Sequence, residues 1–146
     1  MQLRVSGSGA SWYSRNGNDW TARLPDFAPS AKALGEGVFD GELCALKADG
    51  SPDFSALRSY MGSRQTGRIM GDLTFIVFDL LADASGDLRG NPLEARRERL
   101  ETMLGYEPAR IRLAGALPGH DGRALLDAAC RLGLEGIVSK RLSSLY

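Results

Sequence analysis

Alternating apolar and polar residues predict β-strands in the first half of the chain. Leu3 and Val5 alternate with polar neighbours before a Gly-Ser-Gly turn, so residues 2–15 are predicted to form a β-hairpin. Residues 38–47 also alternate and are predicted to form a long strand. Residues 75–81 are apolar except for one acid, which is typical of a strand buried on both faces.

Helical periodicity and capping residues predict four helices. They span residues 30–34, 53–61, 92–104 and 121–132. The third has the clearest start, with Asn91 as the N-cap and Pro92 at the first helical position. A short strand is predicted at residues 111–113, between the last two helices. The inward face of the fourth helix is expected to contain Leu125, Ala129 and Leu132.

Length and composition are those of one globular domain. The 146 residues are 43% hydrophobic and 25% charged, and the formal net charge is zero, so the net charge gives no sign of nucleic-acid binding. No apolar run approaches the roughly 20 residues of a membrane helix, and no export signal is visible. Cys44 and Cys130 are interpreted as reduced core residues of a cytoplasmic protein. The single histidine, His120, excludes a histidine-rich metal site.

Two segments combine acids, a glycine and strand-forming residues. Residues 135–141 read Glu-Gly-Ile-Val-Ser-Lys-Arg, and residues 38–43 read Val-Phe-Asp-Gly-Glu-Leu. Both are predicted to be strands, and a carboxylate on a half-buried strand is costly unless a cation, a metal or a hydrogen-bond donor meets it. Taken alone, each segment is better explained as a surface strand with a solvated acid. Their recurrence favours a site that contains Glu42 and Glu135.

Four short motifs occur in order between residues 11 and 146. They are Ser14-Arg15-Asn16-Gly17 with Asp19-Trp20-Thr21, Phe39-Asp40-Gly41-Glu42-Leu43, Phe75-Ile76-Val77-Phe78-Asp79-Leu80-Leu81, and Glu135-Gly136-Ile137-Val138-Ser139-Lys140. Each is weak alone, but their order and spacing resemble the adenylation domain of ATP-dependent DNA ligases, most closely the bacterial end-joining type. The resemblance implies an α+β nucleotidyltransferase fold, an antiparallel sheet with flanking helices, present here as a single partial domain over residues 1–146. The irregular alternation of predicted strands and helices also favours the α+β class.

The resemblance implies a part in sealing nicked DNA, in repair and recombination, by nucleotidyl transfer with ATP and Mg²⁺. By position, Arg15 would lie near the nucleotide or a DNA phosphate, and Glu42 would bind the ribose or lie near a metal. Phe78 would stack on adenine, and Glu135 would hold the divalent cation, in part through water. Lys140 would bind the nucleotide, although strict alternation places it opposite Glu135 unless the strand contains a bulge.

These residues also have simpler explanations. Without the resemblance, Arg15 is equally well explained as a solvated residue at a hairpin turn. On its pattern alone, Phe78 is better explained as a core residue of a buried strand. Asp40 is interpreted either as a turn cap or as the partner of an arginine.

The resemblance does not include the family's nucleophile. Such ligases attack ATP with the lysine of a Lys-x-Asp-Gly motif, which is expected to precede Met1. Residues 47–50 match that motif in letters, but they are predicted to form a turn in which neither burial nor a neighbouring cation would activate Lys47. The family's later lysine motif and its OB-fold domain are expected beyond Tyr146. The chain is therefore expected to form part of an ATP or AMP pocket, to supply no catalytic residue, and to be inactive alone.

Two other interpretations stay open from the sequence. A non-catalytic, ligase-derived module would bind nucleotide, or would bind DNA through arginines such as Arg64 and Arg68. Both arginines lie in residues 62–72, a segment that is predicted to be mobile. An unrelated hydrolase would use Glu42 and Glu135 as its two carboxylates. The expected partners are nicked duplex DNA, ATP or AMP and a complementary ligase fragment. A homodimer formed through an exposed sheet edge is left open.

Overall fold

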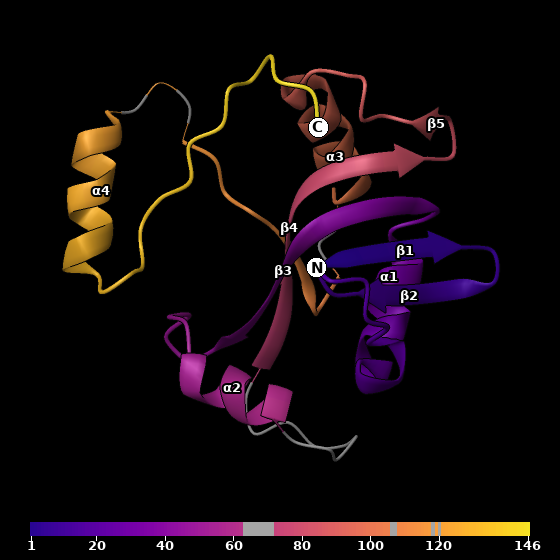
Figure 1. The fold of residues 1–146 in the computed structure, drawn as a ribbon, viewed down its shortest axis with the longest axis horizontal. Helices are drawn as coiled ribbons and strands as arrows, with labels where there is room; N and C mark the ends of the chain where they lie inside the picture. The colour runs from indigo at the N-terminus through magenta and orange to yellow at the C-terminus, as the bar shows by residue number, and fades with distance from the viewer. Residues whose placement is uncertain (63–71, 106–107, 118, 120) are drawn as a thin grey trace.

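Six β-strands form one sheet in the computed structural model, which describes residues 1–62, 72–105, 108–117, 119 and 121–146. The strands are β1 (Gln2–Ser6), β2 (Gly9–Tyr13), β3 (Gly37–Leu46), β4 (Asp72–Asp83), β5 (Gly86–Asp87) and β6 (Ile111–Leu113). Their order is β2-β1-β3-β4-β5 with antiparallel neighbours, and β6 pairs with β4 in parallel (Figure 1). The predicted hairpin, the strands predicted at 38–47, 75–81 and 111–113, and the α+β class are confirmed.

Helices lie around this sheet, and the four predicted ones are all present in the part of the chain that the structure describes. They are α1 (Ala28–Ala33), α2 (Phe54–Gly62), α3 (Leu93–Met103) and α4 (Gly122–Arg131), and two 3₁₀ turns, η1 (Thr21–Arg23) and η2 (Pro25–Phe27), precede α1. Helix α3 packs on β4 and α1 packs on β2, whereas α4 stands apart from the sheet (Figure 1). Within the described residues, no helix has the length and apolar character needed to cross a membrane.

The core lies on one face of the sheet and is built around aromatic rings. The Trp12 ring centroid is 5.4 Å from that of Phe27 and 4.8 Å from that of Phe75, both edge-to-face. Edge-to-face contacts of this kind add to the stabilisation gained by burying the rings. Phe39 pairs with Leu80 between β3 and β4 on the same face. The alternation of β3 therefore turns its acids towards the opposite face.

The start of α3 differs from the predicted cap. The N-cap residue is Pro92, which makes no side-chain cap hydrogen bond, so the prediction that Asn91 caps this helix is wrong. Instead the backbone N–H of Leu93 donates to the carbonyl of Ser144 at 2.9 Å, and that of Glu94 donates to Leu142 at 3.0 Å. A segment distant in sequence therefore satisfies amides that a local side chain was expected to satisfy.

The strand predicted from residue 135 onward is absent from the structure. Residues 135–140 have no regular secondary structure, and Ile137 and Val138 are 43% and 85% exposed. β-branched residues favour strands mainly because they pack against cross-strand neighbours, and this segment pairs with no strand in the described part of the chain. Because the segment is not a strand, alternation does not determine how the side chains of Lys140 and Glu135 lie relative to each other.

Three further predictions of burial are corrected by the structure. Ala129 is buried on α4 as predicted, but Leu132 is 76% exposed because the helix ends at Arg131. Cys130 is exposed, since it lies about 100° around the helix from Ala129. Cys44 is only half-buried, on the open face of β3, and both thiols are free as predicted.

Residues 75–81 of β4 were predicted to be buried on both faces, but one face is only half-buried at two positions. Phe75, Val77 and Leu80 are buried, but Ile76 and Phe78 are half-buried because they lie on the open face of the sheet. The segment predicted to be mobile, residues 62–72, lies outside the described residues apart from its two ends. The predicted DNA-binding arginines, Arg64 and Arg68, fall there too.

The turn after β5 holds an ion pair that gives a testable pH dependence. Asp87 accepts hydrogen bonds from the Arg89 guanidinium, with Nη2 at 2.7 Å, and these lower the pKa of Asp87 from 3.8 to about 2. Since the folded pKa is depressed, the stabilisation is complete above pH 3.8 and is lost as the pH falls through 2. We expect Arg89→Gln to return the pKa of Asp87 towards 3.8. An NMR titration of the carboxyl carbon checks this, and a value still near 2 in the variant would contradict it.

Candidate functional site

A cavity of about 680 Å³ opens on the face of the sheet opposite the aromatic core. Residues from β1, β2, β3 and β4, from the turn after β2 and from the last residues of the chain surround it. The lining includes Gln2, Tyr13, Arg15, Asp40, Phe78 and Tyr146. Its volume is in the range of small-molecule sites, and its lining combines aromatic rings with both signs of charge.

A β-bulge directs Phe78 into this cavity. Asp40 pairs with Asp79 and Gly41 with Val77, so Phe78 is an extra residue in β4. Bulges of this kind re-aim a side chain, and Phe78 is half-buried with its ring against the cavity. The ring therefore contributes apolar surface to a cavity that charged residues also line.

One cation lies over the Phe78 ring and two others lie near Phe78 or in the same cavity. The Lys140 Nζ lies 4.4 Å from the ring centroid, within the range of a cation–π contact. Arg97 Nη1 donates to the Phe78 carbonyl at 3.4 Å, and Arg15 lies in the cavity lining after β2. The site thus combines an aromatic face with positive charge, which suits an aromatic ligand that carries an anionic group.

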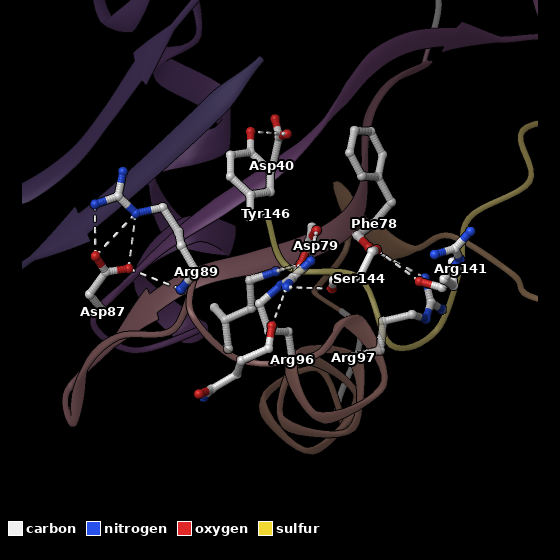
Figure 2. Close-up of polar contacts among 12 residues, drawn as sticks. Asp40, Phe78, Asp79, Asp87, Arg89, Arg96, Arg97, Arg141, Ser144 and Tyr146 are labelled. Carbon is white, nitrogen blue, oxygen red and sulfur yellow. Dashed lines mark hydrogen bonds and ion pairs between the residues drawn. The ribbon is translucent and has the colours of Figure 1, made fainter.

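Asp40 supplies the negative charge of the cavity. The Tyr146 hydroxyl donates to Asp40 Oδ2 at 3.0 Å (Figure 2). The amino group of Met1 lies 3.9 Å from Asp40 Oδ1. These partners differ from the turn or arginine expected for Asp40. Burial raises the pKa of Tyr146, and the hydrogen bond to Asp40 raises it further, so this hydroxyl stays a donor at neutral pH.

The structure brings together three of the five predicted site residues. Arg15 and Phe78 line the same cavity, and Lys140 lies over the Phe78 ring. Glu42 lies on β3 opposite Ile76, exposed and outside the lining. Glu135 is exposed in the segment after α4, and the described residues contain no group of three His, Cys, Asp or Glu side chains that could hold a metal. The role of each of the five residues stays a prediction.

Sequence reasoning missed the buried ion pair beneath the cavity. Asp79 and Arg96 are each 2% exposed, with Arg96 Nε 2.8 Å from Oδ1 and Nη2 2.9 Å from Oδ2 (Figure 2). The signal was present, because Asp79 is the single acid in an apolar strand and a buried carboxylate requires a partner.

Comparison with known proteins identifies the family. The profile of the ATP-dependent DNA ligase domain matches residues 1–146, which is the whole chain. The chain belongs to the ATP-dependent DNA ligase family. The resemblance predicted from the four motifs is thereby confirmed, and the adenylation domain is the part of a ligase that the chain represents.

Its ligase relatives are longer proteins. The chain is 39% identical to the multifunctional non-homologous end joining protein LigD of Pseudomonas aeruginosa, over all of this chain and 17% of that protein. It is 34% identical to a probable DNA ligase of Anaeromyxobacter dehalogenans, over all of this chain and 29% of that protein. The chain therefore spans less than a third of either relative.

Solved ligase structures share its fold. The ligase domain of M. tuberculosis LigD matches with a TM-score of 0.79 and 29% identity, over 99% of this chain and 46% of that one. A mycobacterial DNA ligase D complexed with ATP and MES matches with a TM-score of 0.80 and 28% identity, over the same shares. The predicted α+β ligase-type fold is confirmed.

Proposed function

We propose that this chain forms part of the ATP-binding pocket of a DNA ligase adenylation domain, with Phe78 as the surface on which adenine stacks. The observation that carries the proposal is the cavity that Phe78 and Arg15 both line, with Lys140 over the Phe78 ring. The relative whose structure was solved with ATP supports the same ligand. Sealing of nicked DNA would be the activity of the complete ligase.

The charges of the cavity suit a nucleotide. Lys140 lies on one face of the Phe78 ring, so adenine would stack on the remaining face or displace the ammonium towards the phosphates. Arg15 would offer a planar guanidinium to the phosphate groups. Asp40 would repel them, so the phosphates would extend away from β3 while the sugar lies nearer to it.

Mg²⁺ would be bound jointly by nucleotide and protein. This ion commonly uses one or two carboxylates together with phosphate oxygens and water. Glu135 is exposed and has no carboxylate, thiol or imidazole cluster around it in the described part of the chain, which fits such a shared site better than a closed protein site. Glu135 would help to hold the ion, and the ion would neutralise phosphate charge when the nucleotide is bound.

We assign no nucleophile to this chain. Its three lysines are Lys32 on α1, Lys47 in the turn after β3, and Lys140 over Phe78. Lys47 is exposed beside Asp49, so this turn supplies neither the burial nor the neighbouring cation that would activate a lysine. Incubation with labelled ATP and Mg²⁺, then denaturing electrophoresis, should therefore show no covalent AMP adduct. An adduct would overturn this assignment.

Adenine stacking predicts that Phe78→Ala weakens nucleotide binding. Stacking of a base on an aromatic side chain contributes about 1–3 kcal/mol, so we expect the Kd for AMP to rise about tenfold or more. Ile76→Ala is the matched control, because Ile76 is half-buried on the same face of β4 but outside the cavity lining. Titration calorimetry measures both. Equal affinities, or no AMP binding by the unaltered protein at millimolar concentration, would reject the proposal.

A further inference from the structure

The last six residues, the 141–146 segment, are fixed by their backbone. The carbonyls of Ser144 and Leu142 accept from the first two amides of α3, at 2.9 Å and 3.0 Å. Within the segment, Ser144 N and Oγ both donate to the Arg141 carbonyl, at 3.0 Å and 2.8 Å (Figure 2). The segment therefore follows one path although it contains no helix or strand.

Arg96 joins this segment to the sheet. Two of its guanidinium nitrogens bind Asp79 on β4, and the third, Nη1, donates to the carbonyls of Asn91 and Ser144, the latter at 3.3 Å (Figure 2). A bidentate carboxylate fixes the plane of a guanidinium, so Asp79 determines where Nη1 points. The hydrogen bonds that Arg96 donates to Asp79 raise the pKa of Arg96, which keeps the guanidinium charged.

The positions of two residues, Lys140 and Tyr146, depend on how the 141–146 segment is held. Lys140 directly precedes the segment and follows a stretch, 135–139, that has no regular structure. Tyr146 ends the segment, with its hydroxyl on Asp40 and its N–H donating to the Arg89 carbonyl at 3.1 Å. Because Lys140 lies in no helix or strand, its position over the Phe78 ring is set chiefly by what holds residues 141–146.

We propose that Arg96, oriented by Asp79, is a positioning residue of the cavity: together with the first amides of α3 it holds the 141–146 segment by its carbonyls, and thereby keeps Lys140 over Phe78 and Tyr146 at Asp40. The attachment stands on the contacts alone, and its consequence for nucleotide binding rests on the proposed function.

The test removes the ion pair without leaving a buried charge. The double variant Asp79→Leu/Arg96→Met replaces both partners with apolar side chains, a change that folded proteins commonly tolerate. The control, Asp83→Leu/Arg99→Met, removes another ion pair between the same strand and helix, 2.6 Å from Arg99 Nη2 to Asp83 Oδ2, which has no contact with the segment. Circular dichroism verifies the fold of each protein.

The first readout is the NMR signal of the Lys140 ε-methylene group. A group above an aromatic ring is shifted upfield, and only two other lysines, Lys32 and Lys47, contribute comparable signals. We expect the shifted signal in the unaltered protein and in the control, and its return to the position of the other lysines in the double variant. A folded double variant that keeps the upfield signal would overturn the positioning role.

The second readout is the Kd for AMP, which we expect to rise about tenfold in the double variant and to stay unchanged in the control. An unchanged Kd together with a lost NMR shift would overturn the role in binding. If the unaltered protein binds no AMP but the NMR shift behaves as expected, the attachment stands and the proposed function fails. Arg96→Lys serves if the double variant does not fold, because one ammonium cannot bind Asp79 in a bidentate manner and also reach Ser144.

Discussion

Replacement of Arg96 by alanine is expected to destabilise the protein by about 3–5 kcal/mol, the cost of leaving one partner of a buried ion pair without the other. Asp79 is 2% exposed, so its carboxylate would be left in the core without its cation. The Asn91 and Ser144 carbonyls would lose a donor as well. Urea denaturation, followed by tryptophan fluorescence, measures the change in the free energy of unfolding.

Arg99 provides the matched control for this experiment. It lies on the same helix and pairs with Asp83 on the same strand, but its side chain is 45% exposed. Exposed pairs contribute little, so Arg99→Ala should cost no more than about 1 kcal/mol. Asp79→Leu/Arg96→Met should recover most of the stability lost in Arg96→Ala. A loss for Arg96→Ala as small as that for Arg99→Ala would mean that water reaches Asp79 without cost.

Elements whose cause is local could be predicted from the sequence. The alternation in residues 38–47 sets which side chains of β3 face the core, and the structure has Phe39 and Leu43 buried and Glu42 exposed. The helices follow from their periodicity, and α4 begins as predicted, with Asp121 accepting from the Arg123 N–H at 2.8 Å. The order and spacing of the four motifs indicate the ligase family, and the match to the ligase domain confirms it.

Features that depend on distant partners could not be predicted. Asn91 has a suitable side chain for an N-cap, but the first amides of α3 instead donate to carbonyls about fifty residues later in the chain. Ile137 and Val138 have strand propensity but find no strand to pair with in the described residues. No local pattern indicates that Arg96 is the buried arginine of α3; the position of Asp79 selects it over its neighbour Arg97, whose stem can also be buried.

In the candidate site too, some features could be predicted from the sequence, whereas others depend on distant partners. The resemblance selected Arg15, Phe78 and Lys140; Arg15 and Phe78 line one cavity, and Lys140 lies over the Phe78 ring. The bulge that directs the Phe78 ring into it leaves no pattern in the sequence, because it arises from the register between β3 and β4. Tyr146 was missed because its place depends on the contacts of the 141–146 segment rather than on its neighbours in sequence.

Gly41→Ala is expected to cost about 3 kcal/mol of stability, at the upper end of the usual range for overpacking. A Cβ at this position would lie 2.5 Å from the Ile76 carbonyl oxygen and 2.7 Å from Cζ of Phe75. Neither can yield easily, because the carbonyl belongs to the backbone of the paired strand β4 and the Phe75 ring packs on Trp12 at 4.8 Å.

The matched control is Gly122→Ala at the start of α4, where an added Cβ meets nothing within 4 Å and stability should stay equal or rise by up to about 1 kcal/mol. Denaturation curves of the two variants measure the difference, and a Gly41→Ala protein as stable as the unaltered one would refute the steric argument.

Gly41, between Asp40 and Glu42, lets other groups come close to its backbone, and those groups belong to the core of this protein: the Ile76 carbonyl and the Phe75 ring. A larger residue would separate β3 from β4 and move Asp40 relative to Phe78, so AMP affinity should fall together with stability in Gly41→Ala.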